Sequence, residues 1–185
     1  AALARLEAEG LVRSRQGEGV RILPFQASAG LELLPWLLSY QGADAHLLAQ
    51  FLELRRALAG EAVALACERA DAAQIAQLEH LSELQDAEEI VEAFAARDLE
   101  FARVLLKAAG NLPMQLLLNT VERVYRSHHR LVGALLEDRP AVRQSYRAVI
   151  GLIRSRNANL AREAVRLALQ KIDSRALRQL KSGED

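Results

Sequence analysis

The sequence has few aromatic side chains, a single cysteine and no excess of charge of either sign. Aromatic residues make up 4% of the 185 residues, whereas hydrophobic residues, dominated by Ala and Leu, make up 51%. Strands favour β-branched and aromatic side chains, while Ala and Leu favour helices. The composition therefore predicts an all-α fold in which helices pack against one another.

The balance of charge excludes one simple way of binding nucleic acid. The chain has 24 Lys and Arg residues and 24 Asp and Glu residues, so its formal net charge at pH 7 is zero. No field of the whole chain would attract DNA. Contact with DNA must therefore come from a local basic patch, or from residues that this sequence does not contain.

Three further absences limit the class of protein. The single cysteine, Cys67, excludes an internal disulfide, and its place in a helical run of small apolar residues predicts a core side chain, consistent with a reducing cytoplasm. No apolar stretch of this sequence is long enough to span a bilayer, and we expect no signal peptide. The sequence has neither a nucleophile–base pair nor a glycine-rich phosphate loop ahead of a helix, so we expect no enzymatic activity.

Residues 1–24 follow the order helix, glycine stop, strand, glycine-rich turn and strand. Gly10 ends the helix, and two strands near 11–14 and 20–23 flank the turn. This order is the second half of a winged helix-turn-helix, so the chain is expected to begin partway along the recognition helix. Three arginines surround the turn and are suited to phosphate contacts, although they can equally be solvent-facing strand residues. These DNA-binding candidates are Arg13, Arg15 and Arg21.

The remaining chain has helical periodicity. Residues 25–43 are expected to form a linker with a short helix that begins at an N-cap, Ser28. Residues 44–181 are expected to form an effector-binding and dimerisation domain, a compact antiparallel bundle of six or seven helices. The predicted helices are 44–69, 72–86, 88–108, 112 to about 136, one beginning at 138–140, and 159–181.

Several motifs resemble one family of bacterial regulators. The pattern A-L-x-x-L-x-x-x-G-L-V followed by G-x-G-V, at the start of the chain, resembles the GntR family of transcription regulators. Later stretches at 53–66, 98–111 and 146–169 are similar to the effector-binding FCD domain of the FadR branch of that family. The resemblance covers nearly the whole chain. It implies a homodimer that binds operator DNA through its N-terminal domain and a small-molecule effector through its helical domain.

Many FCD domains hold a divalent metal through one Asp and three His, and the metal binds a carboxylate effector. In this sequence Asp98 keeps the Asp position, but the three His positions are occupied by Ala102, Tyr146 and Ala168. One ligand out of four does not make a selective site. We therefore expect no metal cofactor here, with a metal-dependent carboxylate sensor as the alternative.

The histidines that the chain does contain are expected to lie at the surface or outside a ligand site. His128 and His129 are adjacent, so on one helix they point about 100° apart and rarely reach the same ion. His46 and His80 fall on polar faces of separate predicted helices.

The resemblance leaves the effector open between a small organic acid and a fatty acyl-CoA. Loss of the metal ligands is shared with acyl-CoA-responsive FadR regulators, and Gly110-Asn111, Asn119, Tyr125 and the segment 29–34 are similar to theirs. Gly-Asn can also simply stop a helix. A non-catalytic helical protein-interaction module is the remaining alternative, which a bundle core without a cavity would favour.

Polar side chains at otherwise apolar helical positions are the candidates for effector binding. Arg55 can clamp a carboxylate bidentately, or can form a salt bridge with Glu53, Glu61 or Asp98. We predict an internal pocket lined by Arg55, Asp98 and Tyr146, whose hydroxyl donates to a ligand oxygen. The effector would move the linker and change the wing spacing, and Arg55→Ala would abolish this response while leaving the fold intact.

Two more candidates lie on another predicted helix. Asn119 and Arg123 are spaced i,i+4, so both can face the same cavity. Arg123 can equally lie with Glu122 on a solvated face.

Overall fold

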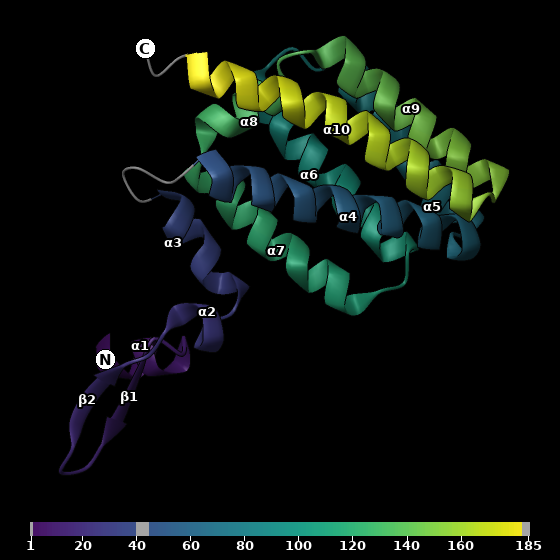
Figure 1. The fold of residues 1–185 in the computed structure, drawn as a ribbon. Coiled ribbons are helices and arrows are strands. Elements are labelled where there is room, and N and C mark those ends of the chain that lie inside the picture. The colour runs from purple at the N-terminus through teal and green to yellow at the C-terminus, as the bar shows by residue number, and fades with distance from the viewer. Residues whose placement is uncertain (1, 40–44, 183–185) are drawn as a thin grey trace.

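The computed structural model describes residues 2–39 and 45–182. Over these residues, a bundle of helices follows a small N-terminal unit that carries a two-stranded antiparallel sheet (Figure 1). The all-α prediction, with the remnant of a wing ahead of the bundle, is confirmed. The hairpin of the N-terminal unit projects away from the bundle.

The N-terminal unit consists of α1 (Ala2–Ala8), β1 (Val12–Arg15) and β2 (Gly19–Ile22). Gly10 ends α1 with a φ of +73°, a left-handed conformation that favours glycine. A Cβ atom on Gly10 would lie 2.2 Å from the carbonyl oxygen of Ser28, so only glycine allows the chain to pass so close there.

The linker contains more helix than the sequence predicted. It forms α2 (Phe25–Ser28), a 3-10 helix η1 (Leu31–Leu33) and α3 (Leu34–Ser39), and residues 40–44 lie outside the described part of the chain. The prediction that Ser28 is an N-cap is wrong: Ser28 ends α2, and its Oγ donates a hydrogen bond to the carbonyl of Pro24 at 2.8 Å.

Two 25-residue helices, α4 and α10, lie side by side along the bundle (Figure 1). A small residue permits close approach, since a Cβ on Gly60 would lie 3.0 Å from the carbonyl oxygen of Arg162. The other helices pack around this pair. The helices of the bundle are α4 (Ala45–Arg69), α5 (Ala72–Asp86), α6 (Val91–Ala108), α7 (Leu112–Ser127), α8 (His129–Leu136), α9 (Arg139–Ser155) and α10 (Ala158–Ser182).

Local capping explains several helix starts. Asp71 accepts from the backbone N–H of Gln74 while the Gln74 side chain accepts from the Asp71 N–H, a capping box that begins α5. Asp138 accepts from the N–H of Ala141 at 3.0 Å, with a proline in the first turn of α9. The sequence predicted both starts.

The predicted helix from 112 to about 136 is instead two helices. The backbone of His128 leaves the helical conformation (φ −126°, ψ 66°), so α7 ends there and α8 begins at His129. The expectation that His128 and His129 share one helix is therefore wrong. The side chains of His46 and His80 are exposed, as predicted.

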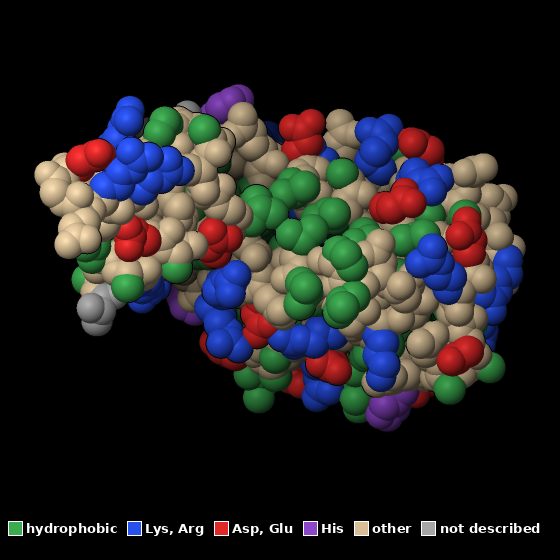
Figure 2. All heavy atoms as spheres, turned by 90° about the horizontal axis from the view of Figure 1, so that it is seen from below, with side chains coloured by type: hydrophobic (Ala, Val, Ile, Leu, Met, Phe, Trp, Pro, Cys, Tyr) green, Lys and Arg blue, Asp and Glu red, His purple; other side chains and the backbone are tan. Residues whose placement is uncertain are grey.

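The outer face of α7 carries exposed leucines. Leu112 and Leu116 are both exposed, and Figure 2 shows hydrophobic side chains gathered on the side of the bundle along which α7 runs. An exposed apolar patch on a folded domain marks a surface that can contact another molecule.

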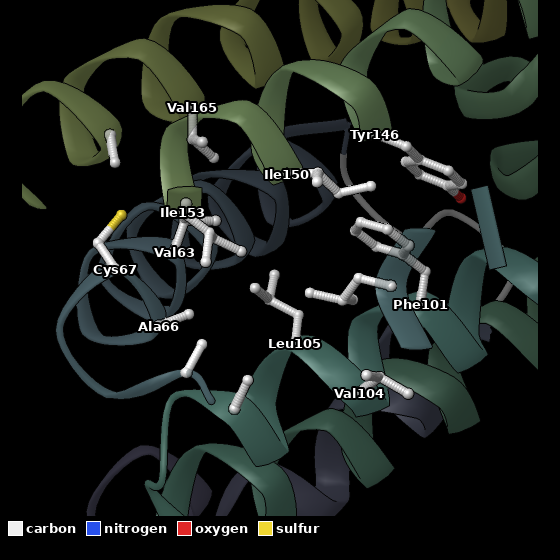
Figure 3. Packing of buried hydrophobic residues seen from close by; sticks show 14 of the residues in the cluster. Val63, Ala66, Cys67, Phe101, Val104, Leu105, Tyr146, Ile150, Ile153 and Val165 are labelled. Carbon is white, nitrogen blue, oxygen red and sulfur yellow. The ribbon is translucent and has the colours of Figure 1, made fainter. Parts of the chain in front are cut away.

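Buried apolar side chains of the described residues form three clusters, and the largest includes residues of α4 and α9. Figure 3 shows Val63, Ala66 and Cys67 of α4 packed against Ile153 of α9. Cys67 is fully buried, its thiol donates to the carbonyl of Leu152 at 3.4 Å, and burial raises the thiol pKa. It is thus the core residue that the sequence predicted.

No helix in the described ranges is long and apolar enough to cross a membrane.

Candidate functional site

A cavity of about 190 Å³ lies within the bundle, lined by residues of α4, α6, α7, α8, α9 and α10. Most of its wall is aliphatic, including Leu58, Leu106, Leu118, Val149 and Leu169. The five polar residues in the wall are Arg55, Asp98, Tyr125, Ser145 and Tyr146. The bundle therefore encloses space that a small molecule can fill, which disfavours a purely structural interaction module.

Asp98 and Tyr146 meet in the cavity wall. The Tyr146 hydroxyl donates to Oδ1 of Asp98 at 2.5 Å, and its ring stacks on Phe101 with centroids 4.2 Å apart and an interplanar angle of 5° (Figure 3). Burial raises the pKa of Asp98, an effect that the Tyr146 hydrogen bond and the charge of Arg55 oppose. Burial, the charge of Asp98 and this hydrogen bond together raise the pKa of Tyr146. The hydroxyl is therefore a fixed donor to the carboxylate.

Arg55 is held by a carboxylate that the sequence analysis missed. Its Nη1 lies 2.7 Å from Oδ1 of Asp173 on α10, and Nη1 of the neighbouring Arg56 lies 2.9 Å from Oδ2. The predicted alternatives, Glu53, Glu61 and Asp98, are not the ion-pair partner. Asp173 falls on the apolar stripe of α10 eight residues after Val165, and an acidic residue at that position is a signal that could have identified it.

Tyr125 completes the polar group around Arg55. Tyr125 and Arg55 interact electrostatically, and burial raises the pKa of Tyr125 to about 12, an effect that the charge of Arg55 opposes. Burial alone would lower the pKa of Arg55, but Tyr125, Asp173 and Asp98 raise it, so the guanidinium stays charged. Burial also raises the pKa of Asp173, against the opposing effect of Arg55 and Arg56.

Three of the five predicted ligand-binding residues line the cavity, and two do not. Arg55, Asp98 and Tyr146 lie together in its wall, whereas Asn119 and Arg123 are exposed on the outside of α7. The prediction that these two face the cavity is wrong. The inward face of α7 consists of Met114, Leu118, Val121 and Tyr125.

Arg123 and the Gly110-Asn111 pair bond within their own part of the chain. Nη2 of Arg123 donates to Oγ1 of Thr120 at 3.1 Å. Gly110 has a φ of +61°, and Oδ1 of Asn111 accepts from the N–H of Met114 at 3.2 Å. The Gly-Asn pair therefore ends one helix and caps the next.

The residues at the family's metal position do not fit a metal ion. Asp98, Ala102 and Tyr146 share the cavity wall, but Ala168 is exposed on α10. The residues of α10 that line the cavity are Val165, Leu169 and Ile172. One carboxylate already bound to a phenol, beside aliphatic side chains, lacks the imidazole and carboxylate donors that such a site requires.

A second, smaller cavity lies where the linker meets the bundle. Leu31 and Leu34 of η1 and α3 face α4 and α7 there. Arg55, Leu58 and Val121 border both this cavity and the large one. These three residues therefore form a shared wall between the internal cavity and the linker.

The three arginines of the wing share one face of the hairpin. Arg13 lies directly opposite Arg21, and Arg15 lies two residues along the same strand. All three side chains are exposed, and Arg15 also forms an ion pair with Glu18 at 3.5 Å. Like charges opposite one another destabilise a strand pair. The arrangement suits a surface that meets a polyanion.

Comparisons with known proteins identify the family of the chain. The sequence profile of the FCD domain matches residues 50–181. An uncharacterised HTH-type transcriptional regulator of Mycobacterium bovis, Mb0601, and the HTH-type transcriptional regulator Mce2R of Mycobacterium tuberculosis are each 32% identical to the chain over 125 residues. Each alignment covers 67% of this chain and 52% of the relative, so the chain spans about half the length of the curated relatives it matches.

A solved structure has the same fold. GntR of Streptococcus agalactiae superposes with a TM-score of 0.61 and 24% sequence identity, covering 94% of this chain and 78% of that one. The likeness includes the N-terminal unit as well as the bundle, since it extends over nearly the whole chain.

Proposed function

Because this chain belongs to the FCD-domain family and the curated relatives it matches are HTH-type transcriptional regulators, we propose that it is a ligand-responsive bacterial transcription regulator without enzymatic activity. Its helical domain binds a small metabolite, and the bound metabolite alters binding to operator DNA. The observation that carries the proposal is the internal cavity, with Arg55, Asp98 and Tyr146 in its wall.

The cavity is suited to a small, mostly apolar effector. Ligand sites in helical bundles are concave and apolar with a few convergent polar groups, and a cavity of about 150 Å³ is large enough to bind benzene. The present cavity, at about 190 Å³, accommodates a ring system or a short chain. Of the two effector classes left open by the sequence, the acyl chain suits this wall better than a small acid, but the carrier group of an acyl-CoA would have to stay outside. The site acts without a metal, since the side chains at the family's metal position do not supply the ligands.

We assign the DNA contact to residues 1–24, a connecting role to 25–43 and effector binding to 44–181. The protein acts in the cytoplasm as a homodimer, so that two wings meet two half-sites of an operator. The exposed leucines of α7, Leu112 and Leu116, support the presence of a partner surface on the bundle.

The shared wall supplies a path from the effector to the wing. A ligand that displaces Leu58 or Val121 from inside also moves the surface on which Leu31 and Leu34 rest. The ligand shifts the linker only if it has different affinities for two arrangements of α4 and α7, one for each position of the linker. Its effect on DNA binding cannot exceed this difference in affinity.

Native mass spectrometry of the purified chain, with metal analysis of the same sample, tests the proposal. We expect a small molecule bound at one per chain without stoichiometric Zn, Ni or Mn. Ala102→Leu fills the cavity from α6 and should abolish that mass, whereas Ala96→Leu makes the same change on the exposed side of the helix and should keep it. A bound molecule that survives Ala102→Leu would place the effector elsewhere, and a stoichiometric metal would favour a metal-dependent carboxylate sensor.

A further inference from the structure

The charges around the cavity are already balanced. Its wall contains one cation, Arg55, and one carboxylate, Asp98. Just behind Arg55, the carboxylate of Asp173 is shared with a second cation, Arg56. Two positive and two negative side chains therefore meet at this end of the cavity, and no excess positive charge is left for an anionic ligand.

Four of the five polar side chains in the wall have a hydrogen-bond partner within the protein. The Arg55 guanidinium donates to Asp173, and the Tyr146 hydroxyl donates to Asp98. Ser145 donates to the carbonyl of Val142 at 2.7 Å, within its own helix. A carboxylate could reach only the N–H groups of Arg55 that Asp173 leaves free, and there it would share the apolar wall with Asp98, whose like charge opposes it.

Asp98 keeps acceptor positions that a ligand can use. An ionised carboxylate offers about four lone-pair positions, and the described hydrogen bonds of Asp98 use one of them, for the Tyr146 hydroxyl. A ligand that donates a single hydrogen bond can take another position on Asp98. A cationic donor would be repelled by Arg55 in the same wall.

We infer that the effector is an uncharged, largely apolar molecule whose hydroxyl group donates a hydrogen bond to Asp98. This inference rests on the proposed function and narrows it, because it excludes the free acid among the candidates. The aliphatic wall holds the apolar body, while the paired polar groups discriminate against either sign of charge.

Isothermal titration calorimetry of the full chain with three probes of equal chain length tests the inference. The probes are 1-octanol, octanoate and octylamine, at neutral pH. We expect 1-octanol to bind at least about tenfold more tightly than either charged probe, which corresponds to about 1.4 kcal/mol. Ala102→Leu should abolish octanol binding, and Ala96→Leu should leave it unchanged.

Asp98→Asn removes the negative charge of the wall without changing its shape. The amide keeps the size of Asp98 and can still accept from Tyr146, but it no longer repels an anion. We expect octanoate affinity to rise by about tenfold in this variant, with the octanol preference lost. Retained octanol binding would show that the variant is folded, and a thermal melt supplies the same check.

The possible results distinguish two failures. Tighter binding of octanoate than of 1-octanol to the unmodified chain would overturn the inference but leave a ligand-responsive regulator in place. Binding of all three probes that is insensitive to Ala102→Leu, or no binding at all, would overturn the cavity as an effector site and the proposed function with it.

Discussion

Arg55 of α4 and Asp173 of α10 form an ion pair at the edge of the internal cavity, with Nη1 and Oδ1 2.7 Å apart. The pair joins the two 25-residue helices of the bundle, and the Asp173 side chain is only 1% exposed. Arg55 thus belongs to the fold as well as to the cavity wall. That Arg55→Ala leaves the fold intact stays a prediction, and the substitution should also cost stability, because it leaves a buried carboxylate with one partner fewer.

Asp173→Ala should destabilise the protein by about 3 kcal/mol, because it leaves two partly buried guanidinium groups without their shared carboxylate. The free energy of unfolding in urea is the measurement. Glu163→Ala, on the same helix, removes a carboxylate from an exposed pair with Arg166 and should cost less than about 0.5 kcal/mol. Equal costs for the two variants would contradict the structural role of Asp173.

Arg13→Ala and Arg21→Ala should each weaken binding to duplex DNA and lower the slope of log affinity against log salt by about one. The reason is that each removes one cation from the exposed face of the hairpin where phosphates are expected. Fluorescence anisotropy with a labelled duplex over a salt series measures the slope. Arg154→Ala, an exposed arginine on α9, is the control, and an equal slope in all four proteins would rule out the wing as the contact surface.

His128→Gln should make the stability less sensitive to acid. Burial lowers the pKa of His128, and no hydrogen-bond partner of its Nε2 lies within the described residues. Between the lowered pKa and the ordinary value of about 6.5, the unfolded chain binds more protons than the folded one, so stability rises with pH and is lost on acidification. Urea unfolding at about pH 8 and about pH 5.5 should show a smaller loss in the variant than in the unmodified protein.

His80→Gln is the control for that experiment, because this side chain is exposed on α5. If His80→Gln and His128→Gln flatten the pH dependence equally, the burial of His128 is not the cause.

Asn111→Ala should cost about 1 kcal/mol of stability, since it removes the side chain that caps α7. Thermal or urea unfolding measures the change. Asn119→Ala makes the same substitution at an exposed position of the same helix and should change stability by less than about 0.5 kcal/mol. Because Asn119 lies outside the cavity, its substitution should also leave octanol affinity unchanged.

The parts of the fold that sequence predicted best are those fixed by local chemistry. Asp71 and Asp138 mark the starts of α5 and α9, because each capping side chain accepts from a backbone N–H only three residues later. No proline or glycine marks the break at His128. The hydrophobic periodicity therefore predicted one helix where the structure has two, α7 and α8. Tertiary packing, which single-sequence patterns do not contain, decides such a break.

The candidate site was predicted in part for a similar reason. Asp98 and Tyr146 share the cavity wall although they are 48 residues apart, and the family resemblance identified both positions. Asp173 pairs with a residue 118 positions away, and no local signal specifies that partner. Asn119 and Arg123 were misplaced because spacing along a helix shows which residues share a face, but not which face turns inward.

The close approach of Gly10 to Ser28 also indicates where the N-terminal unit can rotate relative to the bundle. Because a Cβ on Gly10 would lie 2.2 Å from the Ser28 oxygen, and Leu23 donates to Leu11 at 2.9 Å, α1, the hairpin and α2 are held together as one block. A rotation of this block against the bundle has to be absorbed after Ser28. The first residues available are Ala29 and Gly30, whose extended backbone separates α2 from η1. This extended pair lies directly before Leu31, which borders the smaller cavity together with the shared wall, so a small rotation at the pair would give a larger displacement at the tip of the wing.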